Sequence, residues 1–357
     1  MKKLSWISIA VMVTVMLIFS ACTSGAPSSA PSSAPAKAPA PSGQPVELKL
    51  AHGWATTHHA HVMLDAWTKD VEKATEGRVK ITIYPGGALS TPVQLFDTVS
   101  TGVADLAWFL QGYTPGKFPL TSVIELPFMA TSAEQASQAL WEIYEKTPQM
   151  QAEYPGVKVL ALWTVDTGQL MVAKKVVRNF DEIKGLKLRI GSDSLKPTTE
   201  SLGAVPILMA VNELYDGLQK GVVDGTLIGT SAIKPFKLQD VLKGVTMVDL
   251  FTSAMGLAIN SNSWAKISAQ DQKIIMDLSG TKLAKAMGAN FDSEAKLALD
   301  VAKGAGVEIV ELPAAEKDKW KKAVAGIHQQ WIADMKAKGL PAQEVYDEIT
   351  KLIKKYE

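Results

Sequence analysis

Apolar and polar residues alternate in two short runs, at residues 46–51 and 78–84, and a stretch with helical spacing separates them. A period of two predicts strands with one buried face, and residues 105–110 are predicted as a third strand. Between the first two runs, Met63, Trp67 and Val71 recur along one face and predict a helix. Strands that alternate with helices are typical of an α/β sheet, whose ligands bind at the carboxyl ends of the strands.

The alternation returns between Leu186 and Ile190, where Lys187 and Arg189 fall on the opposite face. Because Gly191 follows at once, we expect the chain to turn there and Arg189 to be exposed. A guanidinium group offers a planar fork of donors that suits a carboxylate. On pattern alone a second interpretation stays open, in which Arg189 is only the solvent side of an ordinary strand.

The rest of the chain predicts a second lobe and a helical end. We expect the chain to cross into this lobe at residues 166–168 and to return along a strand at 255–259. A long helix is predicted to open at Ser268, with Asp271 completing a capping box, and to continue through 278–302. A strand at 307–310 follows, then one continuous helix with an apolar face from Trp320 through Val324 to Met335, and a last apolar-faced helix completes the pattern. Three polar residues are assigned structural or surface roles: Glu213, Asp224 and His328.

The first 45 residues predict export. A basic start and a short apolar run precede Phe19-Ser20-Ala21-Cys22, which resembles a lipoprotein box, so residues 1–22 are interpreted as a signal peptide with lipidation at Cys22. An ordinary cleaved signal and an uncleaved anchor are the alternatives. Residues 23–45 are rich in Ala, Pro and Ser and predict a disordered tether. The folded part is thereby expected outside the cytoplasm, beside the membrane.

Composition narrows the class of function. The formal charge of +1 gives no basic field for nucleic acid, and a single cysteine excludes internal disulfides and multi-cysteine metal sites. The sequence contains no nucleophile elbow, Walker loop or dinucleotide glycine fingerprint. We therefore expect a binding protein without a cofactor, and no enzyme.

Several ordered runs carry a family resemblance. The runs are EKATEGRVKITIYPGGAL, TVSTGVADLA, VIELPF, DEIKGLKLRI, LGAVPI and NELYDGLQKGVVDG. Together they resemble the extracytoplasmic solute receptors of tripartite ATP-independent periplasmic (TRAP) transporters, over nearly all of residues 46–357. The resemblance implies a two-lobed periplasmic-binding-protein fold that closes on its ligand and is read by a membrane permease. It also implies that Arg189 binds the substrate carboxylate. We assign residues 46–166 and 255–294 to the first lobe, and 167–254 and 295–357 to the second.

Two departures from the family pattern bear on the ligand. Many such receptors carry a second arginine where this chain has Gln169 and Leu170, and Glu-Asn where it has residues 226–229. With those polar partners replaced, we expect a monocarboxylate with an apolar or aromatic body. The residues predicted to bind it are Arg189, Trp54, His58, His59, Trp108, Phe109, Tyr113, Met209, Ile228 and Thr230.

Four histidines lie close together in the sequence: His52, His58, His59 and His61. Three interpretations stay open, namely a solvated loop, a wall of the ligand cleft, and a Zn²⁺ or Ni²⁺ site. The cleft is favoured because, in the family, the loop after the first strand faces the ligand. A metal-binding lipoprotein is the alternative function, and a receptor for a sensor instead of a transporter is a third.

Overall fold

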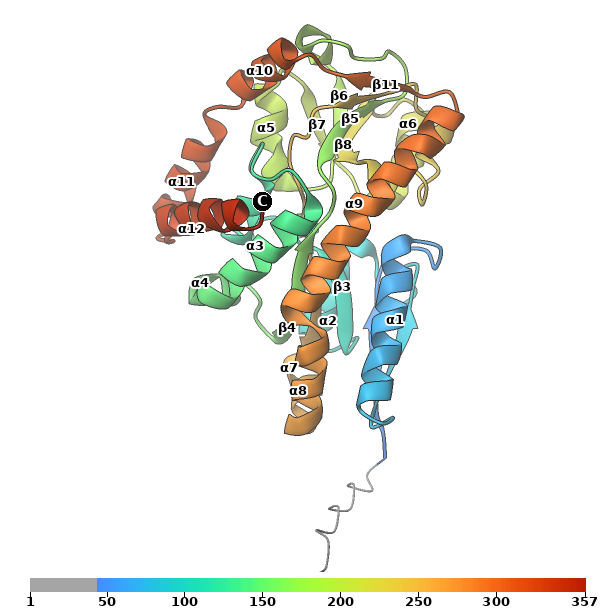
Figure 1. Cartoon of the computed structure of the whole chain (residues 1–357), viewed down its shortest axis with the longest axis vertical. Helices are drawn as coiled ribbons and strands as arrows, with labels where there is room; N and C mark the ends of the chain where they lie inside the picture. Colours follow the sequence, from blue (N-terminus) through green and yellow to red (C-terminus); the bar gives the residue numbers. More distant parts are fainter. Residues whose placement is uncertain (1–43) are drawn as a thin grey trace, which may run out of the picture. The chain divides into compact units, whose positions relative to one another are not determined.

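The computed structural model describes residues 44–357, which form two β-sheets with helices around them (Figure 1). The predicted signal peptide, Cys22 and nearly all of the predicted tether lie outside the described residues. The mixed α/β architecture with two lobes, each built on its own sheet, confirms the predicted fold class. No helix in residues 44–357 has the length and apolar character needed to cross a membrane.

The first sheet has five strands in the order β2-β1-β3-β10-β4. β1 runs parallel to β2 and β3, and β10 runs antiparallel to β3 and β4. The predicted alternation holds in β1, where Leu48 and Leu50 are buried between exposed Glu47 and Lys49. The strand bounds are β1 (Val46–Ala51), β2 (Val79–Tyr84), β3 (Leu106–Leu110), β4 (Val157–Thr164) and β10 (Ala254–Asn260).

The second sheet has six strands in the order β11-β9-β5-β8-β6-β7. β6 is parallel to both β7 and β8, whereas β5 is antiparallel to β8 and β9. β11, which comes late in the chain, adds to the edge beside β9. The bounds are β5 (Gly168–Val172), β6 (Lys187–Ile190), β7 (Val205–Leu208), β8 (Gly225–Gly229), β9 (Gly244–Met247) and β11 (Glu308–Glu311).

Helices surround both sheets, and single 3₁₀ turns follow several strands. The α-helices are α1 (His59–Ala74), α2 (Leu95–Ser100), α3 (Ala133–Lys146), α4 (Pro148–Gln151), α5 (Lys196–Ser201), α6 (Leu214–Gln219), α7 (Ser261–Ala265), α8 (Ala269–Leu278), α9 (Gly280–Gly304), α10 (Ala314–Ala323), α11 (Ile327–Ala337) and α12 (Ala342–Lys355). The 3₁₀ turns used below are η2 (Gln111–Tyr113), η3 (Thr121–Glu125), η5 (Asp193–Leu195), η6 (Val211–Glu213) and η7 (Thr230–Ala232).

The chain crosses from the first sheet to the second between β4 and β5, where the sequence predicts a crossing. Gly168 opens β5 and exchanges backbone hydrogen bonds with Phe251 (2.7 Å) and Leu250 (2.9 Å) on the returning segment. A Cβ at Gly168 would lie 2.2 Å from a ring carbon of Phe251. Only glycine therefore lets the outgoing and returning segments lie side by side here.

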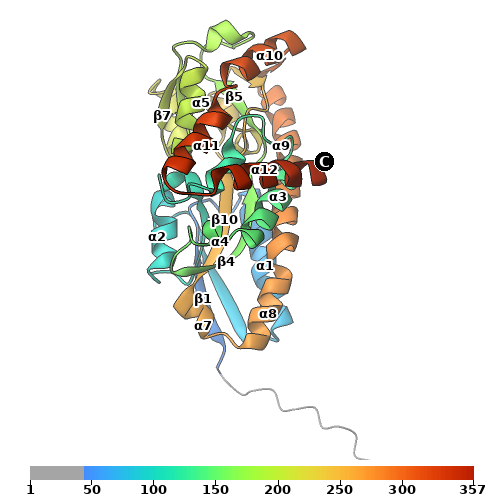
Figure 2. The ribbon, with the colours of Figure 1, turned by 90° about the vertical axis from the view of Figure 1, so that its left-hand side faces the viewer.

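α9 contacts elements of both lobes, from α3 and β4 to η7 and β11, and the two views show it running along both sheets (Figures 1 and 2). The lobe boundary predicted between residues 294 and 295 falls inside this continuous helix. α11 and α12 bury Trp331, Ile332 and Ile353 in the core of the first sheet. This packing differs from the prediction, which grouped all of 295–357 with the second lobe.

Two helices predicted as continuous are broken. Ser279 separates α8 from α9, and Gly280, the first residue of α9, has a φ of +52° beside the ring of Trp141. Val324 ends α10 before α11 begins. His328, predicted on the surface, is half-buried, and its ring nitrogens lie 2.8 Å from the Pro127 carbonyl and 2.8 Å from the Tyr346 hydroxyl.

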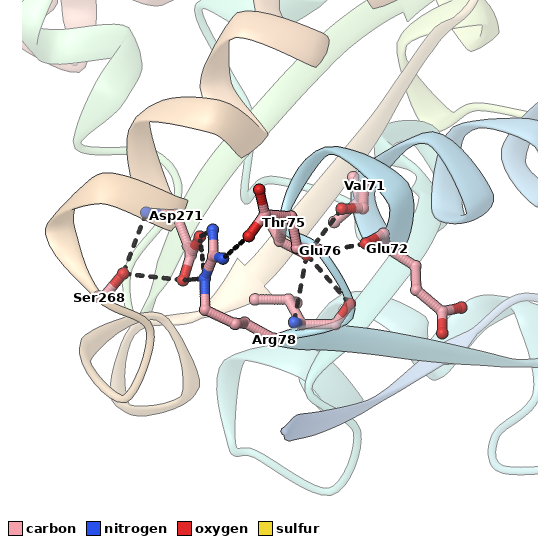
Figure 3. Close-up of polar contacts among 8 residues, drawn as sticks. Val71, Glu72, Thr75, Glu76, Arg78, Ser268 and Asp271 are labelled. Carbon is pink, nitrogen blue, oxygen red and sulfur yellow. Dashed lines mark hydrogen bonds and ion pairs between the residues drawn. The ribbon is translucent and has the colours of Figure 1, made fainter. Parts of the chain in front are cut away.

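The predicted cap at Ser268 is confirmed, because its hydroxyl accepts from the Asp271 backbone N–H at 3.1 Å. Figure 3 shows that the Asp271 carboxylate also meets Arg78, which comes just before β2. The Arg78 Nε and Nη2 atoms donate to Asp271 at 3.1 Å and 2.8 Å. This pair joins α8 to the edge of the first sheet, far from the cavity described next.

Candidate functional site

A cavity of about 60 Å³ lies between the two sheets. β3, β10 and α9 contribute residues to it from one side, and β6, β8 and η7 contribute from the other. Its wall is mostly apolar. The lining residues are Trp54, His58, Leu110, Tyr113, Val165, Asp166, Arg189, Gly191, Val211, Leu227, Ile228, Gly229, Ser231, Ala232, Phe236, Phe251, Ser253, Met255 and Phe291.

Arg189 supplies the only cationic side chain among these lining residues. The prediction that it is exposed was wrong: only 3% of it is accessible, because the first lobe covers the face of β6 that the sequence pattern assigned to solvent. Its Nε donates to the Met209 carbonyl at 2.9 Å, and its Nη2 lies 3.4 Å from the Tyr113 hydroxyl. Within residues 44–357, no carboxylate forms an ion pair with Arg189.

Burial lowers the pKa of Arg189, because the cation has lost its water, although a guanidinium stays charged at any ordinary pH. A buried charge without a counter-charge is costly. Nη1 donates to no protein acceptor in the described part of the chain. The geometry therefore leaves a cation with free donors facing a mostly apolar cavity, which is an arrangement that binds an anion.

Trp54 forms one wall and is itself fixed by a second indole. Its ring stacks on Trp108 with centroids 3.7 Å apart and planes 19° apart. Trp108 is fully buried behind it and does not reach the cavity. Phe109 points to the other face of the sheet and packs on Phe96, at 5.1 Å, and on Phe118. Of the two adjacent aromatics, one therefore supports the cavity wall and the other belongs to the core.

The histidines have separate structural partners. His58 caps α1 and lines the cavity. His52 Nε2 lies 2.9 Å from His61 Nδ1, and His59 Nδ1 lies 2.5 Å from Asn290 Oδ1. Burial and the neighbouring His61 lower the pKa of His52 to about 4. In residues 44–357 no group of three or more His, Cys, Asp or Glu side chains is placed to hold a metal ion, so the structure gives the metal interpretation no support.

The remaining predicted residues divide between the cavity and its surroundings. Ile228 lines the wall. Met209 contributes its backbone carbonyl to Arg189, and its thioether lies near Gly217 of α6. Thr230 donates to the Ala295 carbonyl at 3.1 Å and does not line the cavity. The structure thus brings Trp54, His58, Tyr113, Arg189 and Ile228 together, and places His59, Trp108, Phe109, Met209 and Thr230 outside the lining.

Sequence reasoning missed Asp166, Ser231, Phe236 and Phe291. Asp166 was interpreted only as part of the crossing between the lobes. Phe291 is the sole aromatic residue in the Ala- and Lys-rich stretch 278–302, and that isolation was a usable signal. The other two follow β8 with no distinctive pattern.

Gln169 does not line the cavity, although the corresponding family position often holds a second arginine. Its side-chain oxygen accepts from the backbone of Val248 at 2.6 Å, and its nitrogen donates to Asp249 at 2.7 Å. Asp224 likewise has a structural role, since its carboxylate accepts from the Lys187 backbone at 3.0 Å.

A larger hollow of about 280 Å³ lies between η2, η3, η5 and α11. Its buried carboxylate, Glu125, already accepts from the Ser192 hydroxyl at 2.7 Å and from the Ala254 backbone at 3.2 Å. Its only cationic lining residue, Lys338, is exposed to solvent. Gln111, whose buried Oε1 has no hydrogen-bond partner in the described chain, also lines this hollow. Among the described lining residues, however, no buried cation faces the hollow, and so the Arg189 cavity is the better candidate for an anion.

The family model described as "bacterial extracellular solute-binding protein, family 7" matches residues 50–334. The chain belongs to this family. The match confirms the resemblance drawn from the sequence, since the solved family members are TRAP solute-binding proteins.

Two solved structures are similar over almost their whole length. The TRAP solute-binding protein from Rhodoferax ferrireducens T118, in complex with copurified benzoate, is 28% identical with a TM-score of 0.84, over 87% of this chain and 98% of that one. A marine metagenome family member described as specific for aromatic acid ligands, in complex with 3-hydroxybenzoate, is 30% identical with a TM-score of 0.85, over 88% and 100%. The C4-dicarboxylate-binding periplasmic protein DctP of Rhodobacter capsulatus is 28% identical over 80% of this chain and 86% of that protein.

Proposed function

We propose that this family member is an extracytoplasmic receptor for an organic acid, whose carboxylate Arg189 holds. The observation that carries the proposal is the buried guanidinium with donors facing the cavity and no acidic partner within residues 44–357. A bound carboxylate would provide the missing counter-charge and accept charge-assisted hydrogen bonds, each of which contributes about 1.5–3 kcal/mol.

The ligand is a monocarboxylate with an apolar or aromatic body. Trp54, Leu227, Ile228 and Phe251 offer flat or aliphatic surface around it. A second carboxylate would find no second cation among the lining residues and would meet the Asp166 carboxyl instead. Two of the similar structures, which contain benzoate and 3-hydroxybenzoate, support this chemistry more than the dicarboxylate-binding relative does.

Capture proceeds by closure of the two lobes. Tyr113 from the first lobe and Arg189 from the second both line the cavity, so a ligand that contacts both stabilises the closed state by its differential affinity for that state. The membrane-embedded TRAP permease subunits then recognise the closed receptor and receive the acid. No step in this account makes or breaks a covalent bond.

Export and anchoring rest on the sequence of the first 45 residues. We propose removal of a signal peptide and lipidation of Cys22, which would hold the receptor at the outer face of the membrane. Metabolic labelling with a fatty acid tests this: label should appear in the wild type and disappear in Cys22→Ser. Equal labelling of the two would exclude Cys22 as the anchor.

A thermal-shift screen of the purified protein tests the ligand class, because a ligand that binds only the native state raises the melting temperature. The panel contains benzoate, phenylacetate, succinate and galactonate. We expect shifts for the aromatic monocarboxylates and little or none for the others, and we expect Arg189→Ala to abolish them. Arg178→Ala removes an exposed arginine paired with Glu308 and is the matched control. Shifts that survive in Arg189→Ala, or that succinate alone produces, would contradict the proposal.

A further inference from the structure

His58 places a hydrogen-bond donor in the cavity. As the N-cap of α1, its Nδ1 accepts from the Ala60 backbone N–H at 3.2 Å. Burial lowers the pKa of His58 well below its usual value, so the ring is neutral. A neutral imidazole whose Nδ1 is an acceptor carries its proton on Nε2.

Nothing around His58 in residues 44–357 accepts that proton. The nearest rings are those of His59, stacked with centroids 4.4 Å apart, and Trp108, at 5.7 Å. Three further aromatic rings, which also line the cavity, lie 5.9 Å away for Phe236, 6.3 Å for Trp54 and 6.4 Å for Phe291. Because a buried donor is costly to leave unpaired, the Nε2–H is available to a ligand.

Asp166 supplies an acceptor to the same cavity. Its Oδ1 accepts from the Ser231 hydroxyl at 2.5 Å, and its Oδ2 accepts from the Ser231 backbone at 3.1 Å and from the Thr230 hydroxyl at 3.4 Å. A carboxylate has about four lone-pair positions, so room for one more donor remains. Only 3% of Asp166 is accessible, and within the described chain it forms no ion pair.

The donor and the acceptor both lie beside α9, whereas Arg189 lies against Tyr113 and Met209. The His58 ring packs toward Phe291 of α9, and Thr230, which bonds to Asp166, also bonds to the carbonyl of Ala295 in α9. The cavity therefore combines a cation in one part of its wall with a neutral donor and an acceptor in another.

We propose that the preferred ligand carries a hydroxyl group in addition to its carboxylate, with His58 Nε2–H donating to that hydroxyl and Asp166 accepting from it. This inference rests on the proposed function, because Arg189 is the anchor of the carboxylate. A hydroxyl both donates and accepts at one atom. An ammonium group would leave the His58 donor unpaired.

Isothermal titration of the full chain with matched acids tests the inference. The hydroxyl-free probes are benzoate and phenylacetate, and the hydroxylated probes are the three hydroxybenzoates and mandelate. We expect at least one hydroxylated acid to bind the wild type about tenfold more tightly than the matching acid without the hydroxyl. A ratio of this size corresponds to the contribution of one good hydrogen bond. In His58→Phe and in Asp166→Asn this preference should fall below about threefold. Asp216→Asn, at an exposed residue paired with Lys220, is the control and should keep it.

The outcomes separate the two proposals. If the parent acids bind in an Arg189-dependent manner and no hydroxylated acid binds more tightly, the hydroxyl inference is wrong and the proposed function stands. A preference that persists in both variants also overturns the inference. If no acid in the set binds, the proposed function fails and this inference fails with it. Should Asp166→Asn not fold, the wild-type preference and His58→Phe decide the matter.

Discussion

The Tyr113 hydroxyl lies 3.4 Å from Arg189 Nη2 and accepts a hydrogen bond from the Val211 backbone at 2.9 Å. Tyr113 belongs to η2, directly after the first sheet, and Arg189 belongs to β6 of the second. One phenol therefore contacts the buried cation and the backbone of η6 in the opposite lobe. This contact joins the guanidinium to the first lobe.

Tyr113→Phe should weaken binding of an aromatic acid about five- to tenfold, because one hydrogen bond to a charged group is lost and the Val211 N–H is left unpaired. The melting temperature should also fall slightly. Titration calorimetry with benzoate measures the first effect. Tyr215→Phe, on α6 away from the cavity lining, is the control. Unchanged affinity in Tyr113→Phe would show that the phenol does not position Arg189.

Gly229→Ala should destabilise the protein by about 1–3 kcal/mol, as overpacking does. A Cβ at Gly229 would lie 2.3 Å from Asp166 Oδ1, so the carboxyl must move out of its contacts with Ser231. Urea unfolding measures the change. Gly304→Ala adds the same methyl group at the end of α9, where no atom lies within 4 Å, and should be neutral or stabilising. Equal stability of the two variants would contradict the packing described here.

Asp166 should make stability fall as the pH rises. Burial raises its pKa to about 7, from 3.8, and the charge of Asp292 adds to the effect. Between these two values the folded state holds a proton that the unfolded state has released, so stability present below pH 3.8 is lost as the pH rises toward 7. The melting temperature of Asp166→Asn minus that of the wild type should therefore increase over this window and stay level above it. A difference that does not vary with pH would argue against a raised pKa.

The pair between Arg78 and Asp271 should have the opposite pH dependence. Hydrogen bonds from Arg78 lower the pKa of Asp271, so its stabilisation is present above the unfolded-state value of 3.8 and is lost as the pH falls. Asp271→Asn should lower the melting temperature by a few degrees at pH 7 and by less near pH 3. Asp277→Asn removes an exposed partner of Lys273 and should have little effect. Equal effects at both positions would mean that the contact in Figure 3 adds no stability.

Local pattern was sufficient for most of the elements. β1 and α3 follow directly from periods of two and of 3.6, and Ser132 and Ser268 mark helix starts because their side chains satisfy backbone N–H groups. The break at Gly280 escaped prediction although its neighbours Ser279 and Thr281 are poor helix formers, and Gly280 has its φ of +52° beside the ring of Trp141.

Contacts between the lobes account for the errors at the site. Arg189 alternates with apolar residues as an exposed residue would, and no local pattern records that Tyr113 covers it. Trp108 and Phe109 are adjacent aromatic residues that the sequence pattern does not distinguish. Only the folded structure shows that Trp54 stacks on Trp108. Asp166 and Phe291 lie 125 positions apart in the sequence, and both line the cavity.

A crystal structure of the protein with the tightest-binding acid of the thermal-shift panel tests the central claim most directly. Our account predicts the carboxylate within hydrogen-bond distance of the Arg189 guanidinium and the Tyr113 hydroxyl, with the body of the acid against Trp54. An acid bound in the hollow beside Glu125, or in the cavity with its carboxylate turned away from Arg189, would contradict it.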